Sequence, residues 1–377
     1  MRKIFILTGE PSGDKLASNV IKSLNDKNKD IEYLGVCGSN LKSLGIKSIY
    51  DQKDITYMAF TDVVFNFLKI KKKIDLTVNE VIKFNPCILL TVDSPDFSLR
   101  VSEKVKKINP KIKTIHFIAP KVWAWREGRV KKMKKFLDHI ILLFGFEKKF
   151  FDKENLKNTF VGHPLLDYLE KDINVEIKDF VEKKNIVSLF PGSRGSEIKM
   201  LFPVLINFIK KMNLKDNSYH YIFHSTKKFN EIIKNKLVVE NLSNVEVISD
   251  DNIKSHVLKK SIFAIVKSGT VSLDVCKNNI PSMIIYKMNF FNYHIAKFLL
   301  KIKYVNMINI INNKEIIPEL LQNECNPNEI YKTFYYFMKR PNLIKEQMSV
   351  VKNTIDDLKS PTSASDQASK VILSYLT

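Results

Sequence analysis

Residues 187–199 read V-S-L-F-P-G-S-R-G-S-E-I-K, an apolar run that ends at Pro191-Gly192 and passes through a polar turn into a helix-like segment. A strand followed directly by a tight turn and a helix is typical of a Rossmann-like α/β unit. Backbone N–H groups at such a helix start, together with the helix dipole, favour an anion. Arg194, at the tip of the turn, adds a planar fork of donors that fits phosphate oxygens. The stretch therefore predicts an α/β domain whose first turn binds a diphosphate.

The alternation of strand and helix continues on both sides of this turn. The strand-like runs are Arg2–Thr8, Ile31–Cys37, Cys87–Val92, Thr114–Ile118, His139–Phe144, Asn185–Phe190, Tyr219–His224, Val245–Ile248, Ile262–Val266 and Ser282–Tyr286. Continuous apolar strands separated by helices such as Lys15–Leu24 and Glu197–Met212 are typical of a parallel sheet that is covered on both faces. We therefore expect an α/β protein with two tandem doubly wound Rossmann-like domains that face a cleft.

The length and a charged stretch suggest where the domains divide. The chain has 377 residues, which is too long for one ordinary core. A charged stretch follows the G-H-P turn at residues 162–164. We expect an N-terminal domain over residues 1–167, a C-terminal domain over 168–340, and a helical segment over 341–377 that packs back on an N-terminal domain. Ligands of open α/β sheets bind at the carboxyl ends of the strands, so the functional residues are expected in those loops.

Composition limits the classes of protein that the sequence fits. Hydrophobic residues make up 45% of the chain and charged residues 27%, as in globular proteins. No apolar run is long enough to cross a bilayer, and the stretch Ile4–Leu7 is too short for a signal peptide. We therefore expect the protein in the cytoplasm or on a membrane surface that faces it. The four cysteines lie far apart without a C-x-x-C pair, which argues against a zinc site and a disulfide framework.

The formal net charge of +21 has two possible interpretations. A basic protein can bind nucleic acid, anionic lipid or phosphorylated substrates. The alternative is a compositional bias, because Lys, Ile and Asn are all abundant. Arginine occurs only six times. Lysine cannot reproduce the planar fork of hydrogen-bond donors that a guanidinium group provides. Three of the six, Arg126, Arg129 and Arg194, fall within motifs at strand ends.

Two motifs follow strands of the first domain. G-E-P-S-G-D, residues 9–14, offers glycines for close backbone approach and a helix start for an anion or a sugar hydroxyl. The alternative is a plain strand-to-helix turn with Asp14 as a cap. D-S-P-D-F, residues 93–97, places two carboxylates three residues apart, which suits general-base catalysis on a sugar hydroxyl. Ordinary turn and cap chemistry explains the same residues, and both alternatives stay open.

Two further motifs combine polar or aromatic groups with a helix start. A-P-K-V-W-A-W-R-E-G-R, residues 119–129, holds both tryptophans, Arg126 and Arg129, and suits contact with sugar or phosphate. A packed helix start that uses tryptophan as core is the alternative. K-S-G-T-V-S-L-D, residues 267–274, brings small residues and a threonine to a second helix start in the C-terminal domain. It is suited to the same phosphates, and Asp274 to ribose hydroxyls.

Residues 63–74, V-V-F-N-F-L-K-I-K-K-K-I, are both apolar and basic. On a helix they are suited to bind a membrane surface without crossing it. Phe65, Phe67 and Leu68 are expected at the lipid boundary. The residues expected to face anionic headgroups are Lys69, Lys71, Lys72 and Lys73. The alternative is an amphipathic core helix with a solvated lysine end.

Eight motifs in order give the chain a family resemblance that extends from Gly9 to about Asn309. They are G-E-P-S-G-D, D-S-P-D-F, V-W-A-W-R, E-K-K-F-F, V-G-H-P, L-F-P-G-S-R-G-S-E, S-G-T-V-S-L-D and Y-V-N-M-I-N. The set closely resembles the lipid-A-disaccharide synthase family of bacterial glycosyltransferases. The resemblance implies a GT-B fold and transfer from UDP-2,3-diacylglucosamine to the 6-hydroxyl of 2,3-diacylglucosamine 1-phosphate. The products are a β-1,6-linked disaccharide 1-phosphate and UDP, with inversion at the anomeric carbon.

The resemblance also implies partners and site residues. It implies that no cofactor, metal or nucleic acid is bound. The protein is expected to be cytoplasmic and peripheral on the anionic cytoplasmic face of the inner membrane. A monomer or a homodimer with exchanged C-terminal segments is expected. Asp93 corresponds to the proposed general base, with Asp96 supporting its orientation. Glu10, Ser12, Asp14 and Arg126 belong to the acceptor side. The expected UDP-binding residues are Gly192, Ser193, Arg194, Ser268, Gly269, Thr270, Asp274 and Asn309. The chain departs from the family at Pro11, where a small residue is usual, and at Asp274, where glutamate is usual.

Two other classes of protein compete with this interpretation. One is another enzyme with two Rossmann-like domains, such as a different UDP-sugar transferase or a UDP-sugar epimerase. The V-W-A-W-R segment and the lipid-compatible residues 63–74 argue against it. The other is a non-catalytic binder of RNA or anionic lipid. The scattered basic residues and the absence of RNP-like or KH-like motifs argue against RNA.

Overall fold

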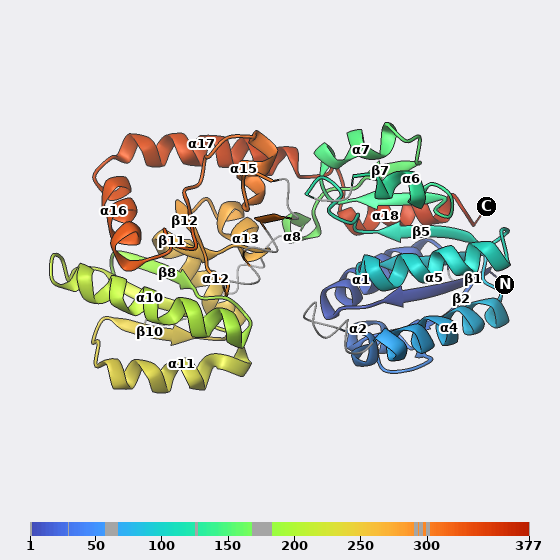
Figure 1. The fold of residues 1–377 in the computed structure, drawn as a ribbon, viewed down its shortest axis with the longest axis horizontal. Helices are drawn as coiled ribbons and strands as arrows, with labels where there is room; N and C mark the ends of the chain where they lie inside the picture. The colour runs from blue at the N-terminus through green and yellow to red at the C-terminus, as the bar shows by residue number, and fades with distance from the viewer. Residues whose placement is uncertain are drawn as a thin grey trace. The chain divides into compact units, whose positions relative to one another are not determined.

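The computed structural model describes residues 2–28, 30–56, 67–124, 127–167, 183–289, 293, 297–298 and 302–376. The chain divides into two compact units (Figure 1). Unit 1 comprises Met1–Asp167 and Leu358–Thr377, and unit 2 comprises Tyr168–Asp357. The first division coincides with the predicted boundary after residue 167. The predicted C-terminal segment over 341–377 is instead shared, because its first helix packs in unit 2 and its last helix packs in unit 1.

Unit 1 is built on a seven-stranded sheet in the order β3-β2-β1-β4-β5-β6-β7, with every pair of neighbours parallel. Its strands are β1 (Arg2–Thr8), β2 (Ile31–Val36), β3 (Lys47–Ser48), β4 (Ile88–Val92), β5 (Lys113–Phe117), β6 (His139–Leu142) and β7 (Asn158–Phe160). β4 is I-L-L-T-V with every residue buried, as expected for a central strand covered on both faces.

Helices cover both faces of this sheet. They are α1 (Pro11–Lys27), α2 (Ser39–Lys42), α4 (Phe67–Phe84), α5 (Pro95–Ile108), α6 (Arg129–Met133), α7 (Lys148–Asp152), α8 (Pro164–Asp167) and α18 (Ala364–Leu373), with 3₁₀ turns η1 (Gln52–Ile55) and η2 (Gly145–Glu147). α1 and α18 share one core with Ile4 and Ile6 of β1, whereas α4 and α5 pack with Phe5 and Leu7 on the other face. α1 begins at Pro11, where proline suits a helix start because its missing N–H is not needed there.

The V-G-H-P turn anchors the returning C-terminal segment to unit 1. Gly162 has a φ of 86°, and a Cβ at this position would lie 2.9 Å from Ser360 Cβ. His163 N–H donates to Leu358 O at 3.1 Å. Ala364 N–H, at the start of α18, donates to Asp167 Oδ2 at 2.6 Å. The turn therefore ends the first stretch of unit 1 and also holds its last helix.

Unit 2 has a six-stranded parallel sheet in the order β10-β9-β8-β11-β12-β13. Its strands are β8 (Ile186–Phe190), β9 (His220–His224), β10 (Val245–Ile248), β11 (Ser261–Lys267), β12 (Ser282–Tyr286) and β13 (Glu319–Leu321). Its helices are α10 (Gly195–Asn213), α11 (Lys227–Glu240), α12 (Asp251–Lys260), α13 (Val271–Lys277), α15 (Met307–Asn312), α16 (Pro327–Met338) and α17 (Pro341–Asp357). Strand and helix alternate in both units, so the predicted class of two tandem doubly wound Rossmann-like domains is confirmed.

The main core of unit 2 lies beneath α10, α11 and α16. Phe208 of α10 packs edge-on against Phe334 of α16 at 5.8 Å between ring centroids. The opposite face of the sheet packs Ile186 and Ile222 against Val257 of α12. Alternating residues of β8 thus enter different cores, as the pleat of a strand requires. Each sheet leaves the carboxyl ends of its strands to loops, and those loops carry the motifs described above.

Candidate active site

The loops after β1 and β4 lie in contact at the centre of the unit 1 sheet. These two strands are neighbours, and the strand order reverses between them, which is the usual place for a ligand in an open α/β sheet. Two glycines permit the close approach. A Cβ on Gly9 would lie 2.2 Å from Ser94 Oγ, and one on Gly13 would lie 3.3 Å from Asp93 Cβ. The G-E-P-S-G-D and D-S-P-D-F motifs therefore form one continuous loop surface.

Asp93 is held in a strained backbone conformation. Asp93 and Ser94 have φ values of 58° and 46°, in the left-handed region that side chains rarely adopt. Such strain persists only where surrounding contacts fix it. Asp93 N–H donates to Phe117 O at 3.0 Å, and Ser98 Oγ donates to Asp93 O at 2.8 Å. Because both backbone groups of Asp93 are bonded, the position of its side chain is fixed by the sheet and by α5.

The environment of the Asp93 carboxylate suits a base. The side chain is half-buried, and Ser94 N–H donates to its Oδ1 at 2.8 Å. Burial raises the pKa of Asp93, while the Ser94 N–H and the Lys121 ammonium act in the opposite direction. A carboxylate with a raised pKa accepts a proton more readily than an ordinary one. Asp93 is thus partly desolvated and still reachable by a hydroxyl group.

Glu10 and Ser12 lie in the first turn region of α1, and both side chains are exposed. The backbone beneath them is held from η1. Gln52 Nε2 donates to Glu10 O at 3.0 Å, and Thr56 Oγ1 donates to Gly9 O at 2.8 Å. The structure therefore places Glu10 and Ser12 on the same loop surface that contacts the Asp93 loop, and their acceptor-side role stays a prediction.

Asp14 has a structural position. It is fully buried, at 0% exposure. Its carboxylate accepts hydrogen bonds from Gly38 N–H at 2.7 Å and Asn40 N–H at 2.8 Å, and from Asn40 Nδ2 at 3.0 Å. These bonds fix the loop between β2 and α2. The burial of Asp14 does not agree with the expectation that it lines the substrate surface.

The two remaining acceptor-side expectations have different outcomes. The Asp96 side chain is 69% exposed and pairs with Arg129 at 3.0 Å. Arg129 also donates to Pro95 O at 3.2 Å, so it fixes the first turn of α5. This pairing differs from the predicted role of Asp96 in orienting Asp93. Arg126 lies outside the described residues.

Glu147 is a buried acid that the sequence interpretation missed. Trp123 Nε1 donates to Glu147 Oε1 at 3.2 Å, which ties the A-P-K-V-W-A-W-R segment to η2. Burial raises the pKa of Glu147 to about 8, although the Trp123 indole, the Phe144 N–H and the Lys121 ammonium lower it. The charge of Lys121 acts on Asp93 as well. Glu147 is the first residue of the E-K-K-F-F motif. The motif gave no sign of its burial, because the burial depends on contacts with residues outside the motif.

In unit 2, the turn after β8 binds the carboxylate of Glu197, an anionic side chain of the protein itself. Gly192 has a φ of 105°, and a Cβ there would lie 2.4 Å from Glu197 Oε2. Ser193 N–H and Arg194 N–H donate to the same oxygen at 3.0 and 3.3 Å. The two side chains at the tip, Ser193 and Arg194, are exposed. The turn therefore favours negative charge, and two of its N–H groups bind Glu197.

Glu197 also joins this turn to β11. Its Oε1 lies 2.8 Å from Lys267 Nζ, and the two side chains are 13% and 18% exposed. Burial opposes ionisation, but Lys267 and the N–H groups of Ser193 and Arg194 hold the pKa of Glu197 below its ordinary value. Lys267 Nζ also lies 5.4 Å from the centroid of the Tyr286 ring. A single acid thus connects the ends of two neighbouring strands.

The turn after β11 lies beside the turn after β8, because the two strands pair directly. Ser268 Oγ donates to Val305 O at 3.2 Å, and Gly269 and Thr270 are exposed. Asp274 lies on α13, where it is half-buried. The structure therefore brings the residues expected at the phosphates together at one edge of the unit 2 sheet.

Asn309 lies inside unit 2, at 0% exposure. Its Nδ2 donates to Ile317 O at 2.7 Å and to Glu319 Oε1 at 2.8 Å, and its Oδ1 accepts from Ile316 N–H at 2.8 Å. The side chain thus fixes the segment that leads into β13. This position differs from the expectation that Asn309 contacts the nucleotide, and it makes Asn309 a support for the surrounding backbone.

The basic segment over residues 63–74 is described from Phe67 onward, where α4 begins. Phe65 lies outside the described residues, as does the side chain of Phe67. Leu68 is 73% exposed. Lys69, Lys71 and Lys72 are exposed too. Lys73 differs, because it pairs with Asp54 at 2.6 Å and lies over the Tyr50 ring. Contact of the exposed residues with a membrane stays a prediction.

Two properties of the described residues bear on cofactors and membranes. No group of three or more potential metal ligands occurs among them. Within the same residues, no helix is long and apolar enough to span a membrane.

Comparisons with known sequences identify close relatives. The family model for lipid-A-disaccharide synthetase matches residues 4–372. A lipid-A-disaccharide synthase from Sulfurihydrogenibium sp. (strain YO3AOP1) is 33% identical over 362 residues, covering 92% of each chain. One from Rickettsia bellii (strain OSU 85-389) is 33% identical over 379 residues, covering 99% of this chain and 98% of the relative.

Solved structures share the fold at much lower identity. The UDP-GlcNAc 2-epimerase from Neisseria meningitidis bound to UDP-GlcNAc aligns with a TM-score of 0.63 at 12% identity, covering 99% of this chain and 100% of that one. The MurG of Acinetobacter baumannii aligns with a TM-score of 0.60 at 11% identity and the same coverage. These similarities show the two-Rossmann GT-B type of fold.

Proposed function

The chain belongs to the lipid-A-disaccharide synthetase family and is a glycosyltransferase of lipid A disaccharide synthesis, and from this premise we propose its substrates and mechanism. The donor is UDP-2,3-diacylglucosamine and the acceptor is 2,3-diacylglucosamine 1-phosphate. The products are the β-1,6-linked disaccharide 1-phosphate and UDP. The observation that carries the mechanism is the strained, doubly anchored Asp93 at the centre of the unit 1 sheet.

Asp93 acts as the general base in this proposal. Its carboxylate takes the proton of the acceptor 6-hydroxyl while that oxygen attacks the anomeric carbon of the donor. The bond from the anomeric carbon to the diphosphate oxygen breaks, and UDP leaves with the electron pair. Attack from the face opposite the α-linked diphosphate gives the β linkage. Burial supports this role because it raises the pKa of Asp93 and favours proton transfer to it.

The leaving diphosphate is assigned to the two adjacent turns of unit 2. The exposed Arg194 fork meets the phosphate oxygens, and Ser193, Gly269 and Thr270 lie on the same sheet edge. The start of α10 contributes the positive end of its dipole. Ser268 and Gly192 shape the two turns, and Asp274 is assigned to the ribose. The proposal includes no metal, and retention of activity after treatment with a chelator tests that part.

Glu197 is assigned a positioning role, which the sequence interpretation did not contain. It holds Ser193 and Arg194 by their N–H groups and binds Lys267 with its second oxygen. The Arg194 side chain is therefore presented from a turn that is already ordered. A preorganised donor loses less conformational entropy when it binds a phosphate.

The acyl chains of both substrates require contact with a membrane surface. We assign this contact to the start of α4, where Leu68 is 73% exposed and is accompanied by exposed lysines. The enzyme would then be peripheral on the cytoplasmic face of the inner membrane. Lys73 is left out of the contact surface because Asp54 binds it.

A single-turnover assay tests the proposed reaction. The full chain is mixed with UDP-2,3-diacylglucosamine and the acyl acceptor in mixed micelles, and UDP and disaccharide are followed together. We expect both products to appear at the same rate. UDP release without disaccharide would mean hydrolysis or a different acceptor. Absence of UDP release from a folded enzyme would contradict the donor assignment.

A further inference from the structure

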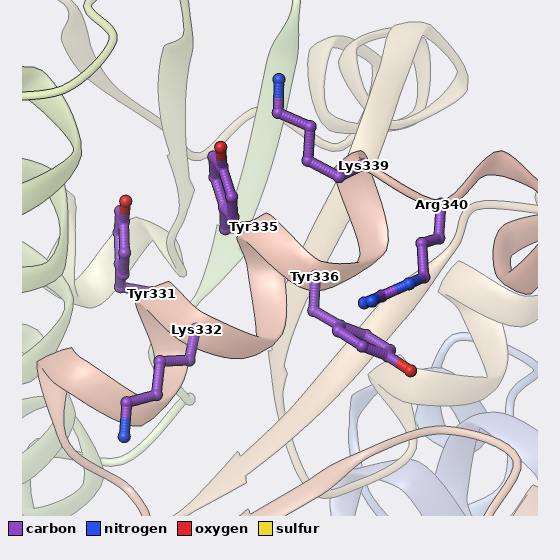
Figure 2. Close-up of a pocket in the computed structure, with 6 residues that line it drawn as sticks. All are labelled: Tyr331, Lys332, Tyr335, Tyr336, Lys339 and Arg340. Atoms are coloured by element: carbon purple, nitrogen blue, oxygen red, sulfur yellow. The ribbon is translucent and has the colours of Figure 1, made fainter.

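Two rows of side chains lie on the outer face of α16 and continue just past its end. Positions 331, 335 and 339 form one row, and 332, 336 and 340 form the other, each with the four-residue spacing of a helix face. Figure 2 shows the two rows pointing to different sides of the helix. We call these residues the α16 surface, which lines a pocket of about 360 Å³: Tyr331, Lys332, Tyr335, Tyr336, Lys339 and Arg340.

Aromatic rings hold the cations of the α16 surface in place. The rings of Tyr331 and Tyr335 stack at 5.8 Å between centroids with an interplanar angle of 16°. Arg340 Cζ lies 3.7 Å from the centroid of Tyr336, and Lys339 Nζ lies 5.4 Å from that of Tyr335. Such cation–π contacts order the basic groups before a ligand arrives. Tyr335 and Tyr336 are each 48% exposed, so the rings are also available to a partner.

Positive charge exceeds negative charge around this surface. Lys211 of α10 adds a fourth cation, 5.1 Å from the Tyr331 ring centroid. Glu329 pairs with Lys332 at 2.6 Å. Hydrogen bonds from Ser218 lower the pKa of Asp216, and the charge of Lys339, at the other end of the surface, adds to this shift. Two acids thus accompany four cations, which makes the α16 surface complementary to an anionic partner.

An exposed leucine at the end of α10, a helix that packs on α16, favours lipid over nucleic acid. Leu214 follows α10 and is 86% exposed. In sequence it lies between Lys211, which contacts the ring of Tyr331 in α16, and Asp216, on which the charge of Lys339 just past α16 acts. Tyrosine, lysine and arginine occur together at membrane–water interfaces, with apolar side chains entering the acyl boundary. A single-stranded nucleic acid would use the stacked rings and the cations, but it has no use for a projecting leucine.

We propose that the α16 surface and Leu214 dock on an anionic phospholipid bilayer. The inference rests on the proposed function, in which acylated substrates are taken from and returned to a membrane. Tyr335 and Tyr336 sit at the headgroup level, Leu214 enters the acyl boundary, and Lys339 and Arg340 bind lipid phosphates. Unit 2 thereby has a lipid contact of its own, separate from the start of α4 in unit 1.

Vesicle binding of the full chain, without sugar substrates, tests the proposal. The vesicles contain phosphatidylcholine alone or phosphatidylcholine with phosphatidylglycerol. In the first variant Lys332, Lys339 and Arg340 are each changed to Gln, and we expect binding to the anionic vesicles to fall about 100-fold, from roughly fivefold per basic residue. In the second, Leu214, Tyr335 and Tyr336 are each changed to Ser, and we expect weaker binding that is lost at high salt, because the remaining attraction comes from the unchanged charge alone.

The matched control neutralises three exposed lysines elsewhere on unit 2, at positions 234, 236 and 260. Compositional charge alone would make this control lose as much binding as the first variant, and that result would overturn the proposal. The proposal would also be overturned if the full chain bound RNA and both variants abolished this binding while vesicle binding stayed intact. Self-association of the chain that depends on the α16 surface would overturn it as well. Circular dichroism verifies that each variant is folded. The single-turnover assay in detergent micelles reports separately on the reaction, so either proposal can fail alone.

Discussion

The Glu197 carboxylate lies 2.8 Å from Lys267 Nζ and so links the turn after β8 to the end of β11. The same carboxylate accepts from the N–H groups of Ser193 and Arg194. The two turns assigned to the diphosphate therefore share one internal anion. Their geometry is set before any substrate binds, and each turn depends on the other.

Removing the charge of Glu197 is expected to weaken UDP binding. Glu197→Gln keeps the shape of the side chain but leaves Lys267 without its ionic partner, so the turn loses order. We expect about a tenfold loss of UDP affinity by calorimetry, the value of one charge-assisted hydrogen bond. Lys267→Gln should give a similar loss, and the double variant should lose little more than either single variant. If the loss of binding free energy in the double variant equalled the sum of the two single losses, Glu197 and Lys267 would act independently, which would contradict their coupling.

Asp93→Asn is expected to abolish most turnover. Asparagine retains an oxygen for the Ser94 N–H but cannot accept the acceptor proton. Loss of a general base costs about 10²–10⁴-fold in rate. The rate of disaccharide formation measures the effect, while UDP affinity should stay close to wild type. Asp96→Asn is the comparison, because that carboxylate is 69% exposed and bound to Arg129. Equal losses in the two variants would rule out a special role for Asp93.

Arg194→Ala is expected to weaken UDP binding about 10–100-fold, because hydrogen bonds to charged groups contribute roughly 1.5–3 kcal/mol. The salt dependence of binding should also decrease. Arg194→Lys should fall between wild type and Ala, since it keeps the charge without the planar fork. Titration calorimetry at several salt concentrations provides the measurement. Lys199→Ala on the exposed side of α10 is the control, and a loss there equal to that of Arg194→Ala would indicate a general charge effect.

Glu147 makes the stability of unit 1 depend on pH. Its pKa is raised from an ordinary 4.5 to about 8, so between these values the folded state holds a proton that the unfolded state releases. The free energy of unfolding therefore falls as pH rises through this window, by up to about 1.4 kcal/mol per pH unit. Glu147→Gln removes this contribution and should flatten the profile.

Urea unfolding across this pH window tests the Glu147 prediction. Both tryptophans, Trp123 and Trp125, belong to unit 1, so their fluorescence reports on its unfolding. Glu127→Gln, at an exposed position, should leave the slope unchanged. Equal slopes in the Glu147→Gln variant and the wild type would mean that Glu147 is ionised in the folded protein.

The exposed lysines at the start of α4 are expected to control binding to anionic vesicles. Changing Lys69, Lys71 and Lys72 to Glu should reduce this binding by at least about 100-fold, with little effect on neutral vesicles. The same reversal at the exposed positions 131, 134 and 135 on and beside α6 serves as the control. If both triple variants lost the same vesicle binding, the binding would depend on the net charge of the protein and not on the lysines of α4.

The sequence was sufficient to predict the features that depend on local pattern. Continuous apolar strands predicted both parallel sheets, and polar motifs at strand ends located the loops around Asp93 and Arg194. The resemblance then assigned these loops to substrates. Local pattern works here because strand burial and turn chemistry are determined largely by neighbouring residues.

The roles of buried polar side chains were not predictable in the same way. Asp14 and Asn309 lie in motifs that fit a substrate site, yet their side chains bind backbone groups inside the protein. The partner of Asp14 at Gly38 is 24 residues away in sequence. Glu147 and Glu197 show the reverse case, because Trp123, which binds Glu147, and Lys267, which binds Glu197, are distant in sequence and are brought to them only by packing. An acidic residue in a motif does not reveal whether it faces a ligand or the chain.

The docking of α18 on α1 has a consequence for synthesis on the ribosome. Ser23 and Lys27 of α1 bond to Asp366 of α18, and the apolar faces of the two helices share one core. All of unit 2 is translated between these helices. A nascent unit 1 must therefore wait with one apolar side of α1 uncovered until α18 has been synthesised, and such transiently exposed apolar surface favours aggregation during the delay.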